Sequence, residues 1–304
     1  MTMEKILLTG ATGQLGKTFS RHFAHSHLTG KYALLAFDRK EMDLTKEEST
    51  SSILSLYKPS IIINCGAYTS VDEAENESEL AKIVNDEAVS RISNWASEND
   101  CRLIHISTDF VFDGTADKPY LPSDLACPIG VYGKTKLAGE KRIQESLAER
   151  GVIIRTSWLY SEFRQNFVRT MIRLMAEKPD LGVVGDQLGS PTSAHTLSCV
   201  LLKVIEMQSV WGILHWCDGA SISWYDFAVE IQKVAFKHGL LSKKIRLEPL
   251  MTADYPTLAI RPRYSVLDRS FTLEQLGVIA TDWRIELKKV IEQISKNLRD
   301  SSGA

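Results

Sequence analysis

Several features that mark particular classes of protein are missing from this sequence of 304 residues. None of its apolar runs approaches the length of a membrane-spanning helix, and its first residues enter an apolar strand directly, without the layout of a signal peptide. Lysine and arginine (36) nearly balance aspartate and glutamate (38), for a net charge of −2. Such a balance creates no bulk field that would attract nucleic acid or an anionic membrane. We therefore expect neither nucleic acid nor a membrane among its partners.

Paired cysteines and clustered metal ligands are also missing. The five cysteines are odd in number and widely spaced, and no two have the spacing of metal ligands. They are Cys65, Cys101, Cys127, Cys199 and Cys217. Thiols in this pattern are typical of a reducing compartment. The histidines at 22, 25 and 27 fit a solvated helix end better than a metal site. We therefore expect a cytoplasmic protein without a metal.

What the first half of the chain does contain is a glycine turn between a strand and a helix. The apolar run 6–9 predicts a buried parallel strand, and apolar residues recur at helical spacing from Leu15 to Phe23. Glycines at positions 10, 13 and 16 permit a tight turn, a close approach to a pyrophosphate and close packing of the helix on the strand. A plain turn is the alternative, but this context favours a dinucleotide site. Its predicted contacts are Gly10, Thr12, Gly13, Gln14 and Leu15.

The second strand, 32–37, ends in two residues that favour different cofactors. Asp38 lies roughly 20 residues past the glycine turn, where an acidic residue binds the adenosine ribose of NAD. Arg39 can pair instead with the 2′-phosphate of NADP. A solvated charge pair is the plainer alternative. We expect NADPH, with NADH possible, and place Asp43 and Leu44 beneath the adenine.

Two further strands, 61–64 and 102–107, also lead into candidate binding residues. In an open α/β sheet, ligands bind beyond the carboxyl ends of the strands. The residues after the third strand that we expect to approach the cofactor are Cys65, Gly66, Ala67 and Tyr68. Thr108 follows the fourth strand and offers a hydroxyl to a substrate oxygen; capping of local backbone is the alternative. With a fifth strand at 151–155, the alternation predicts a doubly wound α/β fold.

Tyr132 and Lys136 lie four residues apart in a segment that reads as a helix, so they share one face. The same stripe continues through Gly139, Ile143 and Leu147, which is the apolar side and should face a core. An isolated buried ammonium is costly, so Lys136 needs a polar partner. The tyrosine hydroxyl and the hydroxyls of a bound ligand would supply one. The alternative is that Tyr132 packs in the core and Lys136 extends to the surface.

These motifs carry a family resemblance. The matching stretches are 9–16, 64–69, 107–112, 128–140, 155–158, 186–192 and 261–262. Together they resemble the extended short-chain dehydrogenase/reductase family, and most closely its dTDP-4-dehydrorhamnose reductase branch. The glycine turn is shared by many families, whereas the stretches at 107–112, 155–158 and 186–192 are far more specific.

The resemblance implies a Rossmann-type sheet with a smaller C-terminal substrate lobe and a triad of Thr108, Tyr132 and Lys136. The reaction implied is reduction of the C4 keto group of dTDP-4-dehydro-6-deoxy-L-mannose to dTDP-L-rhamnose. Tyr132 would donate a proton to the carbonyl oxygen, Thr108 would orient that oxygen, and Lys136 would hold the nicotinamide ribose. Because a nearby ammonium favours the phenolate, we expect Lys136 to lower the pKa of Tyr132.

The resemblance also assigns the two halves of the chain. Residues 1–155 are expected to bind the cofactor and residues 156–304 mainly the sugar nucleotide, with a segment near 181–205 returning to the first lobe. The implied substrate contacts are Thr108, Asp109, Phe110, Trp158, Asn166, Gln187 and Arg261. Plainer alternatives exist for three of these: a core residue for Trp158, a connecting loop for Gln187 and a surface cation for Arg261.

At two places the sequence departs from the residue patterns of related enzymes, and each departure argues against a property of those enzymes. Sugar-nucleotide 4,6-dehydratases pair an aspartate with a following glutamate at this strand exit, whereas Asp109 is followed by Phe110, so dehydration is disfavoured. Some rhamnose reductases form a metal-bridged dimer through two glutamates, and Thr18 and His195 fall at those places here. We therefore expect no metal bridge, and a monomer or a homodimer.

Two other functions compete with this reading. The triad alone does not exclude a reductase or epimerase of another nucleotide sugar. An NADP-binding regulatory subunit of the methionine adenosyltransferase beta type would require no intact triad, so the presence of the triad argues against it.

Overall fold

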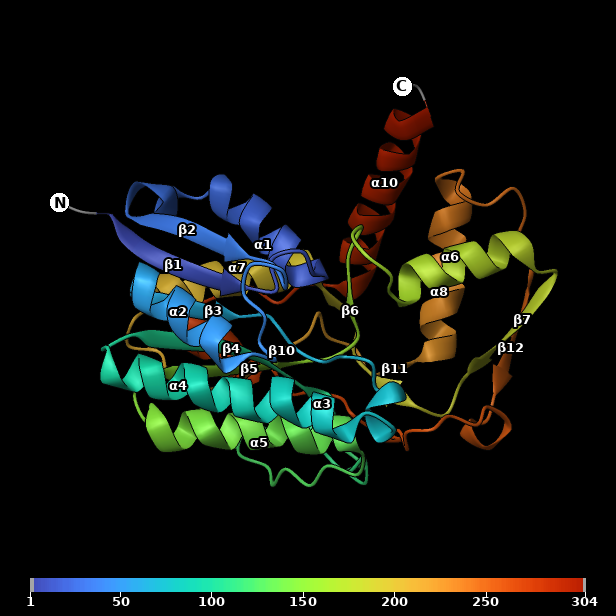
Figure 1. Cartoon of the computed structure of the whole chain (residues 1–304). Coiled ribbons are helices and arrows are strands. Elements are labelled where there is room, and N and C mark those ends of the chain that lie inside the picture. Colours follow the sequence, from blue (N-terminus) through green and yellow to red (C-terminus); the bar gives the residue numbers. More distant parts are fainter. Residues whose placement is uncertain (1–2, 303–304) are drawn as a thin grey trace.

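The computed structural model describes residues 3–302, which form a large lobe built on a parallel sheet and a smaller lobe beside it (Figure 1). The sheet has six strands in the order β10-β5-β4-β3-β1-β2, all paired in parallel. The strands are β1 (Glu4–Thr9), β2 (Tyr32–Phe37), β3 (Ile61–Asn64), β4 (Arg102–Thr108), β5 (Gly151–Thr156) and β10 (Gly212–Trp216). The order reverses between β1 and β3, which confirms the predicted doubly wound fold.

Helices cover both faces of this sheet because its strands are apolar on both sides. Ile6 and Leu8 of β1 point to one face and Leu7 to the other, as strand geometry requires. The helices of this lobe are α1 (Gln14–Ala24), α2 (Glu47–Tyr57), α3 (Ser78–Lys82), α4 (Ala88–Glu98), α5 (Val131–Ser146), α7 (Ala194–Glu206) and α9 (Ser270–Leu276), with a π-helical turn at Ile83–Glu87 between α3 and α4.

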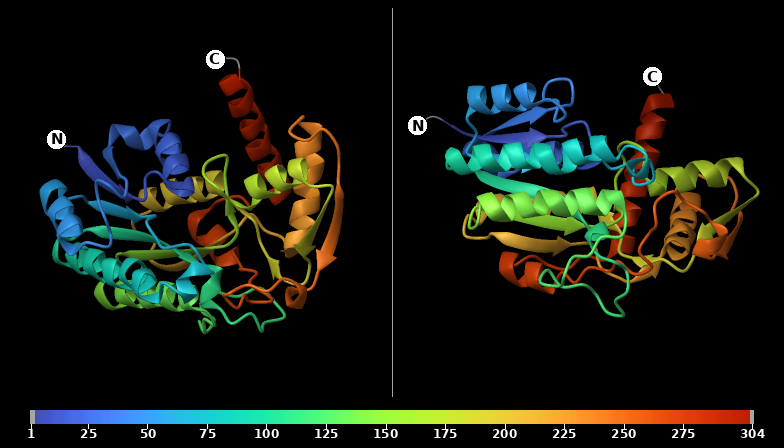
Figure 2. Two further views of the ribbon diagram at one scale, coloured as in Figure 1. Left: turned by 45° about the vertical axis from the view of Figure 1, so that its right-hand side comes forward. Right: turned by 60° about the horizontal axis from the view of Figure 1, so that its bottom comes forward.

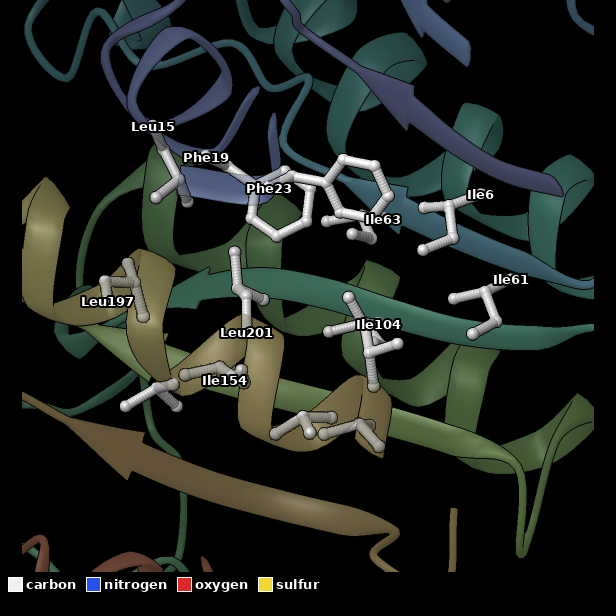
Figure 3. Close-up of a cluster of buried hydrophobic side chains, with 14 of the residues drawn as sticks. Ile6, Leu15, Phe19, Phe23, Ile61, Ile63, Ile104, Ile154, Leu197 and Leu201 are labelled. Carbon is white, nitrogen blue, oxygen red and sulfur yellow. The ribbon is translucent and has the colours of Figure 1, made fainter. Parts of the chain in front are cut away.

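The two faces bury separate apolar clusters. On the first face, strand residues such as Ile63 and Ile104 meet Phe19 and Phe23 of α1 and Leu201 of α7 (Figure 3). On the second face, α2, α4 and α5 pack against the alternate strand residues. Burial at roughly 25 cal/mol per Å² of apolar surface makes such clusters the main stabilising term of the fold. The result is a rigid sheet whose carboxyl ends point towards the smaller lobe (Figures 1 and 2).

The smaller lobe has its own core. Its elements are α6 (Phe167–Glu177), α8 (Trp224–Lys237), α10 (Trp283–Ser302) and a parallel pair formed by β7 (Asp180–Val184) and β12 (Arg246–Leu250). Phe227 of α8 is fully buried between Tyr160, Phe167 and Trp283. Two short pairs connect this lobe to the sheet: β6 (Leu159–Tyr160) with β9 (Thr192–Ser193), and β8 (Leu188–Gly189) with β11 (Ile222–Ser223).

The chain crosses between the lobes more than once. After β7, the chain returns to the large lobe, where α7 packs on α1 and β10 pairs with β5. β10 thereby forms one edge of the main sheet. The elements that return to the large lobe span residues 194–216, whereas the strand at 180–184 belongs to the smaller lobe. The predicted lobe boundary between residues 155 and 156 stays a prediction. No helix within residues 3–302 combines the length and apolar character that crossing a membrane requires.

Candidate active site

A cavity of about 970 Å³ lies between the carboxyl ends of the strands and the smaller lobe. Segments that follow β1, β2, β3, β4 and β5 line it, together with α5 and residues of the smaller lobe. The reversal of strand order between β1 and β3 lies within this wall, where open α/β sheets bind ligands. Of the site residues predicted from the sequence, all but Asp38 and Gln187 line this cavity.

The glycine turn is held in a shape that only glycine allows at one position. Gly10 has φ +66°, and a Cβ there would lie 2.9 Å from the backbone of Cys65. The N–H of Gly13 donates to the Gly10 carbonyl at 2.9 Å, and Gly13 then caps α1. Arg164 of the smaller lobe donates to the Thr12 carbonyl at 2.8 Å. The turn thus presents the N-terminus of α1, with its free N–H groups, as an anion cradle.

Gln14 and Asn166, which were predicted to contact the cofactor and the substrate, form a hydrogen bond that joins the two lobes. The Nδ2 of Asn166 donates to Gln14 Oε1 at 2.9 Å, and Ser161 donates to the same oxygen at 3.1 Å. The Oδ1 of Asn166 accepts the Arg169 N–H at 3.2 Å and so caps α6. Both side chains line the cavity, but their hydrogen bonds fix the position of the smaller lobe relative to the glycine turn.

The end of β2 separates the two residues that favour different cofactors. The Asp38 carboxylate accepts the backbone N–H groups of Lys40 and Glu41 at 2.8 and 3.1 Å, which closes a turn, and the residue does not line the cavity. Arg39 does line the cavity, and its largely exposed side chain lies 3.9 Å from Asp43. The cation, and not the acid, therefore lies on the cavity that the glycine turn borders.

Hydrogen bonds with the side chains of Thr9 and Asn85 fix the backbone that follows β3. Thr9 Oγ1 accepts the Gly66 N–H at 3.0 Å. Asn85 accepts the Tyr68 N–H at 2.9 Å and donates to the Tyr68 carbonyl at 3.1 Å, so this buried amide fixes the backbone that lines the cavity. Desolvation raises the pKa of the Cys65 thiol to about 12, which keeps it neutral.

Close packing of α5 brings Tyr132 to the end of β4. Any Cβ at Gly133 would overlap the carbonyl oxygen of Phe110, so only glycine allows the helix to approach this closely. The Tyr132 ring meets the Phe110 ring edge-on at 5.7 Å. Thr108, the last residue of β4, accepts the Phe110 N–H at 3.2 Å and donates to Asp109 at 3.1 Å. The three members of the predicted triad are therefore brought together on one wall of the cavity.

The pKa of Tyr132 corrects one expectation. Burial raises it to about 12, the neighbouring Thr108 hydroxyl lowers it, and the charge of Asp109 raises it further. The predicted lowering by Lys136 was wrong, because desolvation of the phenolate outweighs any attraction to the ammonium. The phenol therefore keeps its proton at neutral pH, as a proton donor must.

Lys136 lies inside the protein, with 2% of its surface exposed, which confirms that the helix turns this lysine inward. Its Nζ donates to the Ile106 carbonyl at 2.7 Å and lies 3.0 Å from Nε2 of His105. Burial lowers the pKa of Lys136 to about 8, against the charge of Glu140 and the Cys65 thiol. Glu140 is fully buried one turn further along α5, where it pairs with Arg155 at 2.6 Å and accepts from Ser107.

Asp109 is an unusual carboxylate on the substrate side. It is 2% exposed and lines the cavity, and its Oδ2 has no hydrogen-bond partner among the described residues. Burial raises the pKa of this carboxyl to about 6, against hydrogen bonds that lower it. A buried oxygen without a partner is costly unless a ligand supplies a donor. The position favours a contact with a substrate hydroxyl.

Two stacked indoles form the opposite wall. Trp158, at φ +45°, stacks on Trp224 with ring centroids 3.5 Å apart and planes at 12°. A Cβ at Gly189 would lie about 2.5 Å from the Trp158 ring, so a glycine beneath the ring makes room for it. Both indoles line the cavity. A flat apolar surface of this kind suits the carbon face of a sugar or a base.

A segment of the smaller lobe reaches across the cavity mouth. Arg261 pairs with Asp72 at 2.7 Å, and Asp72 also accepts the Ala259 N–H at 3.2 Å. Gln187 lies behind this segment and donates to Thr252 at 3.1 Å, in a small adjoining cavity that also touches Trp158 and Arg261. The guanidinium of Arg261 is placed to meet an anion in the main cavity. Gln187 lines only the small adjoining cavity.

The two positions where some relatives carry metal-bridging glutamates hold other groups. Thr18 is buried and donates to the Gln14 carbonyl at 2.9 Å. His195 pairs with Glu162 at 2.9 Å and lies 2.9 Å from His22. No group of three or more metal-ligating side chains is found within residues 3–302. The absence of a metal stays a prediction.

Comparisons with known proteins decide the family. Residues 3–296 match the model of the RmlD substrate binding domain. A dTDP-4-dehydrorhamnose reductase of Aggregatibacter actinomycetemcomitans is 39% identical over 95% of this chain and 98% of its own length. The chain belongs to this family. A crystal structure of a family member from Clostridium acetobutylicum has a TM-score of 0.88 at 36% identity, and covers 95% of this chain and 99% of its own.

A further family member, from Bacillus anthracis, was crystallised in complex with NADP. It has a TM-score of 0.88 at 33% identity, over 96% of this chain and 100% of its own. The reductase family therefore covers both lobes of the chain, and not the nucleotide-binding part alone.

Sequence reasoning missed several residues at the site of this family member. Trp224 lines the cavity, Asp72 pairs with Arg261, and Arg164 donates to the Thr12 carbonyl, but none of Trp224, Asp72 and Arg164 was singled out from the sequence. His105 was read as an ordinary strand residue, although it contacts Lys136. Only the capping box at Ser223 hinted at Trp224, because it places an aromatic residue in the first turn of α8.

Proposed function

We propose that this protein reduces the C4 keto group of dTDP-4-dehydro-6-deoxy-L-mannose to dTDP-L-rhamnose with NADPH, as a step of nucleotide-sugar and cell-surface polysaccharide biosynthesis. The observation that carries the proposal is the meeting of Thr108, Tyr132 and Lys136 on one wall of a cavity of about 970 Å³ that the glycine turn also lines. Family membership over both lobes supports the substrate as well as the chemistry.

The residues present fit NADPH. The glycine turn offers an anion cradle at the N-terminus of α1, in a shape that a Cβ at Gly10 would fill. Arg39 supplies a cation at the end of β2, while Asp38 is engaged with its own turn. A relative of similar fold was crystallised with NADP, which supports the same choice here. When bound, NADPH supplies the hydride.

The chain itself handles the proton. Because the pKa of Tyr132 is raised to about 12, its hydroxyl stays protonated and can donate to the C4 oxygen as that oxygen gains charge. The Thr108 hydroxyl stands beside it to hydrogen-bond and orient the same oxygen. The Lys136 ammonium stabilises the phenolate that Tyr132 leaves behind. Proton transfer by a positioned side chain typically contributes about 10²–10⁴-fold in rate.

The substrate wall supports a sugar nucleotide. The stacked indoles of Trp158 and Trp224 offer a flat surface, the free oxygen of Asp109 offers an acceptor for a hydroxyl, and Arg261 offers a cation for the diphosphate. The residue after Asp109 is Phe110 and not an acid, so the second catalytic group that elimination of water would need is lacking there. Simple reduction therefore fits better than dehydration.

The test of the reaction is absorbance at the nicotinamide band. Protein and NADPH are mixed with dTDP-4-dehydrorhamnose generated in situ from dTDP-glucose by the upstream dehydratase and epimerase. We expect rapid loss of absorbance and a dTDP-rhamnose product. If NADPH binds but is not oxidised, the sugar is a different one and a panel of nucleotide sugars follows; tight binding with no turnover on any of them favours a regulatory role.

The choice of cofactor has its own test. In Arg39→Ala we expect the KM for NADPH to rise by about tenfold and the KM for NADH to stay within about twofold, because a charge-assisted hydrogen bond to the 2′-phosphate is lost. Lys40→Ala is the matched control, because Lys40 is an exposed neighbour that does not line the cavity. Equal changes for both cofactors would contradict the assigned role of Arg39.

We also infer a cytoplasmic location, which the five free thiols support because they suit a reducing compartment. A monomer or a homodimer is expected, and light scattering on the purified chain distinguishes the two.

A further inference from the structure

His105 is a buried titratable residue that the proposed reduction does not use. It lies on β4 with no exposed surface, beneath the cavity wall and not on it. Its Nε2 is 3.0 Å from Nζ of Lys136, and its Nδ1 is 3.1 Å from Nδ2 of Asn64. The ring therefore connects the catalytic lysine to a second buried polar side chain.

The contact continues across the sheet. Asn64 Oδ1 lies 2.6 Å from Thr9 Oγ1, and Thr9 pairs with Asn64, and Asn64 with His105, at adjacent positions of β1, β3 and β4. The four side chains are Thr9, Asn64, His105 and Lys136, and none is more than 2% exposed. Because they are buried, the protons of these side chains need acceptors nearby, either within the set or on the backbone.

The hydrogen bonds among these four side chains have a definite donor-to-acceptor direction. Burial and the charge of Lys136 hold the pKa of His105 well below its usual value, so the ring is neutral and carries one N–H. Thr9 Oγ1 already accepts the Gly66 N–H, and its own proton goes to Asn64 Oδ1. The Asn64 amide then donates to Nδ1 of His105, which leaves the imidazole proton on Nε2, facing Lys136.

That order suits only one charge state of the lysine. An ammonium has three donors and no acceptor, so an Nε2–H facing it would set donor against donor. An uncharged amine accepts this N–H and still donates to the Ile106 carbonyl. The order reverses if the Asn64 amide turns over, because His105 then donates from Nδ1 to Oδ1, and Nε2 accepts from the ammonium. In the reversed order the Asn64 amide faces Thr9 Oγ1, so the Thr9 proton loses Oδ1 as its acceptor, which is the cost of the ammonium form.

We propose that His105 is a positioning residue whose tautomer, set by Asn64, is coupled to the charge of Lys136, which lies one helical turn from Tyr132 on α5. The ammonium form stabilises the phenolate left by Tyr132, whereas the amine form does not. The other ionisable groups that face Lys136 are Glu140 from α5 and the Cys65 thiol after β3. Glu140 is itself paired with Arg155, and although its charge favours the ammonium, burial of Lys136 outweighs it.

The coupling has a direct spectroscopic test that requires no substrate. Full-length protein labelled with ¹⁵N-histidine is titrated from about pH 6 to pH 10, around the range in which a partly destabilised lysine loses its proton. Of the seven histidines, His105 is assigned by the loss of its signals in His105→Gln. We expect the Nδ1–H tautomer at low pH and the Nε2–H tautomer at high pH. A single tautomer over the whole range would overturn the proposal.

A second test uses enzyme kinetics and rests on the proposed reduction. As pH rises and Lys136 loses its proton, kcat/KM should fall along a basic limb with the midpoint of the tautomer change. In Asn64→Asp the carboxylate only accepts, so it keeps the proton on Nδ1 and favours the ammonium, and the limb should move up by about one pH unit or more. Asn94→Asp makes the same change on an exposed position of α4 and should leave the limb in place.

The outcomes separate this inference from the proposed function. A tautomer change without reduction of any nucleotide sugar would support the coupling and contradict the substrate. Reduction with an identical basic limb in wild type and Asn64→Asp would contradict the coupling and leave the reaction intact. If Asn64→Asp does not fold, the titration of the wild-type protein decides alone.

Discussion

The two walls of the cavity are built in different ways. The sheet wall consists of residues at or just after strand ends, such as Gly10, Cys65 and Thr108, which are fixed by the register of parallel strands. The lobe wall consists of residues such as Trp158, Trp224 and Arg261, which are held by stacking and by single ion pairs. The comparison suggests that the sheet wall carries the chemistry, and that the lobe wall selects the substrate with more tolerant contacts.

The largest effect is expected on the sheet wall. Tyr132→Phe removes the proton donor and should lower kcat by about 10²–10⁴-fold. Binding of NADPH, measured by fluorescence titration, should change little, because the ring remains. Tyr255→Phe is the control, since this exposed tyrosine lies outside the cavity. A kcat within a few fold of wild type would show that another group supplies the proton.

The second prediction concerns the close approach of α5 to the end of β4. Gly133→Ala places a methyl group on the Phe110 carbonyl, which is backbone and cannot move aside alone. We expect a loss of about 1–3 kcal/mol in the free energy of unfolding and a lower kcat, because Tyr132 moves with the helix. Gly30→Ala is the matched control, since a Cβ there meets nothing within 4 Å. Equal stability of the two variants in thermal unfolding would contradict the packing argument.

Much of the sheet wall could be predicted from the sequence. Strand ends can be read locally, since an apolar run followed by glycine or by a polar residue marks both the strand and its exit. The glycine turn, Thr108 and the inward turn of Lys136 were therefore predicted. His105 was not, because its place beside Asn64 depends on the register of two strands that are 41 residues apart along the chain.

The lobe side was less predictable for the same physical reason. The pairing of β10 with β5 joins segments far apart in the sequence, and hydrophobic periodicity does not encode such a pairing. Trp224 meets Trp158 only after the chain has crossed between the lobes. The pKa of Tyr132 was misjudged because burial, which outweighs the nearby charge, depends on how the whole wall packs.

A smaller effect is expected on the lobe wall. Trp224→Ala removes the partner on which Trp158 stacks, and should raise the KM for the sugar nucleotide by about tenfold while kcat changes less. The control is Trp211→Ala, because Trp211 is half exposed and lies away from the cavity. Should kcat fall as far as in Tyr132→Phe while KM stays constant, the division between a catalytic wall and a selecting wall would be wrong.

The smallest effect is expected where the lobe wall meets the large lobe. Asp72→Ala removes the carboxylate that pairs with Arg261 and that accepts the Ala259 N–H. Because both charged groups are partly exposed, the pair contributes about 0–1 kcal/mol, and we expect the KM for the sugar nucleotide to rise by only about two- to threefold. The KM for NADPH should not change.

The salt dependence makes this last comparison sharper. Raising the ionic strength screens an exposed pair, so the difference between wild type and Asp72→Ala should shrink at high salt. Asp100→Ala is the matched control, since Asp100 pairs with Arg150 just before the amino ends of β4 and β5, at the opposite edge of the sheet from the cavity. A lower KM in Asp72→Ala would mean that the carboxylate competes with the substrate diphosphate for Arg261. The segment at 259–261 would then be held back by Asp72 until substrate arrives, instead of being positioned by it.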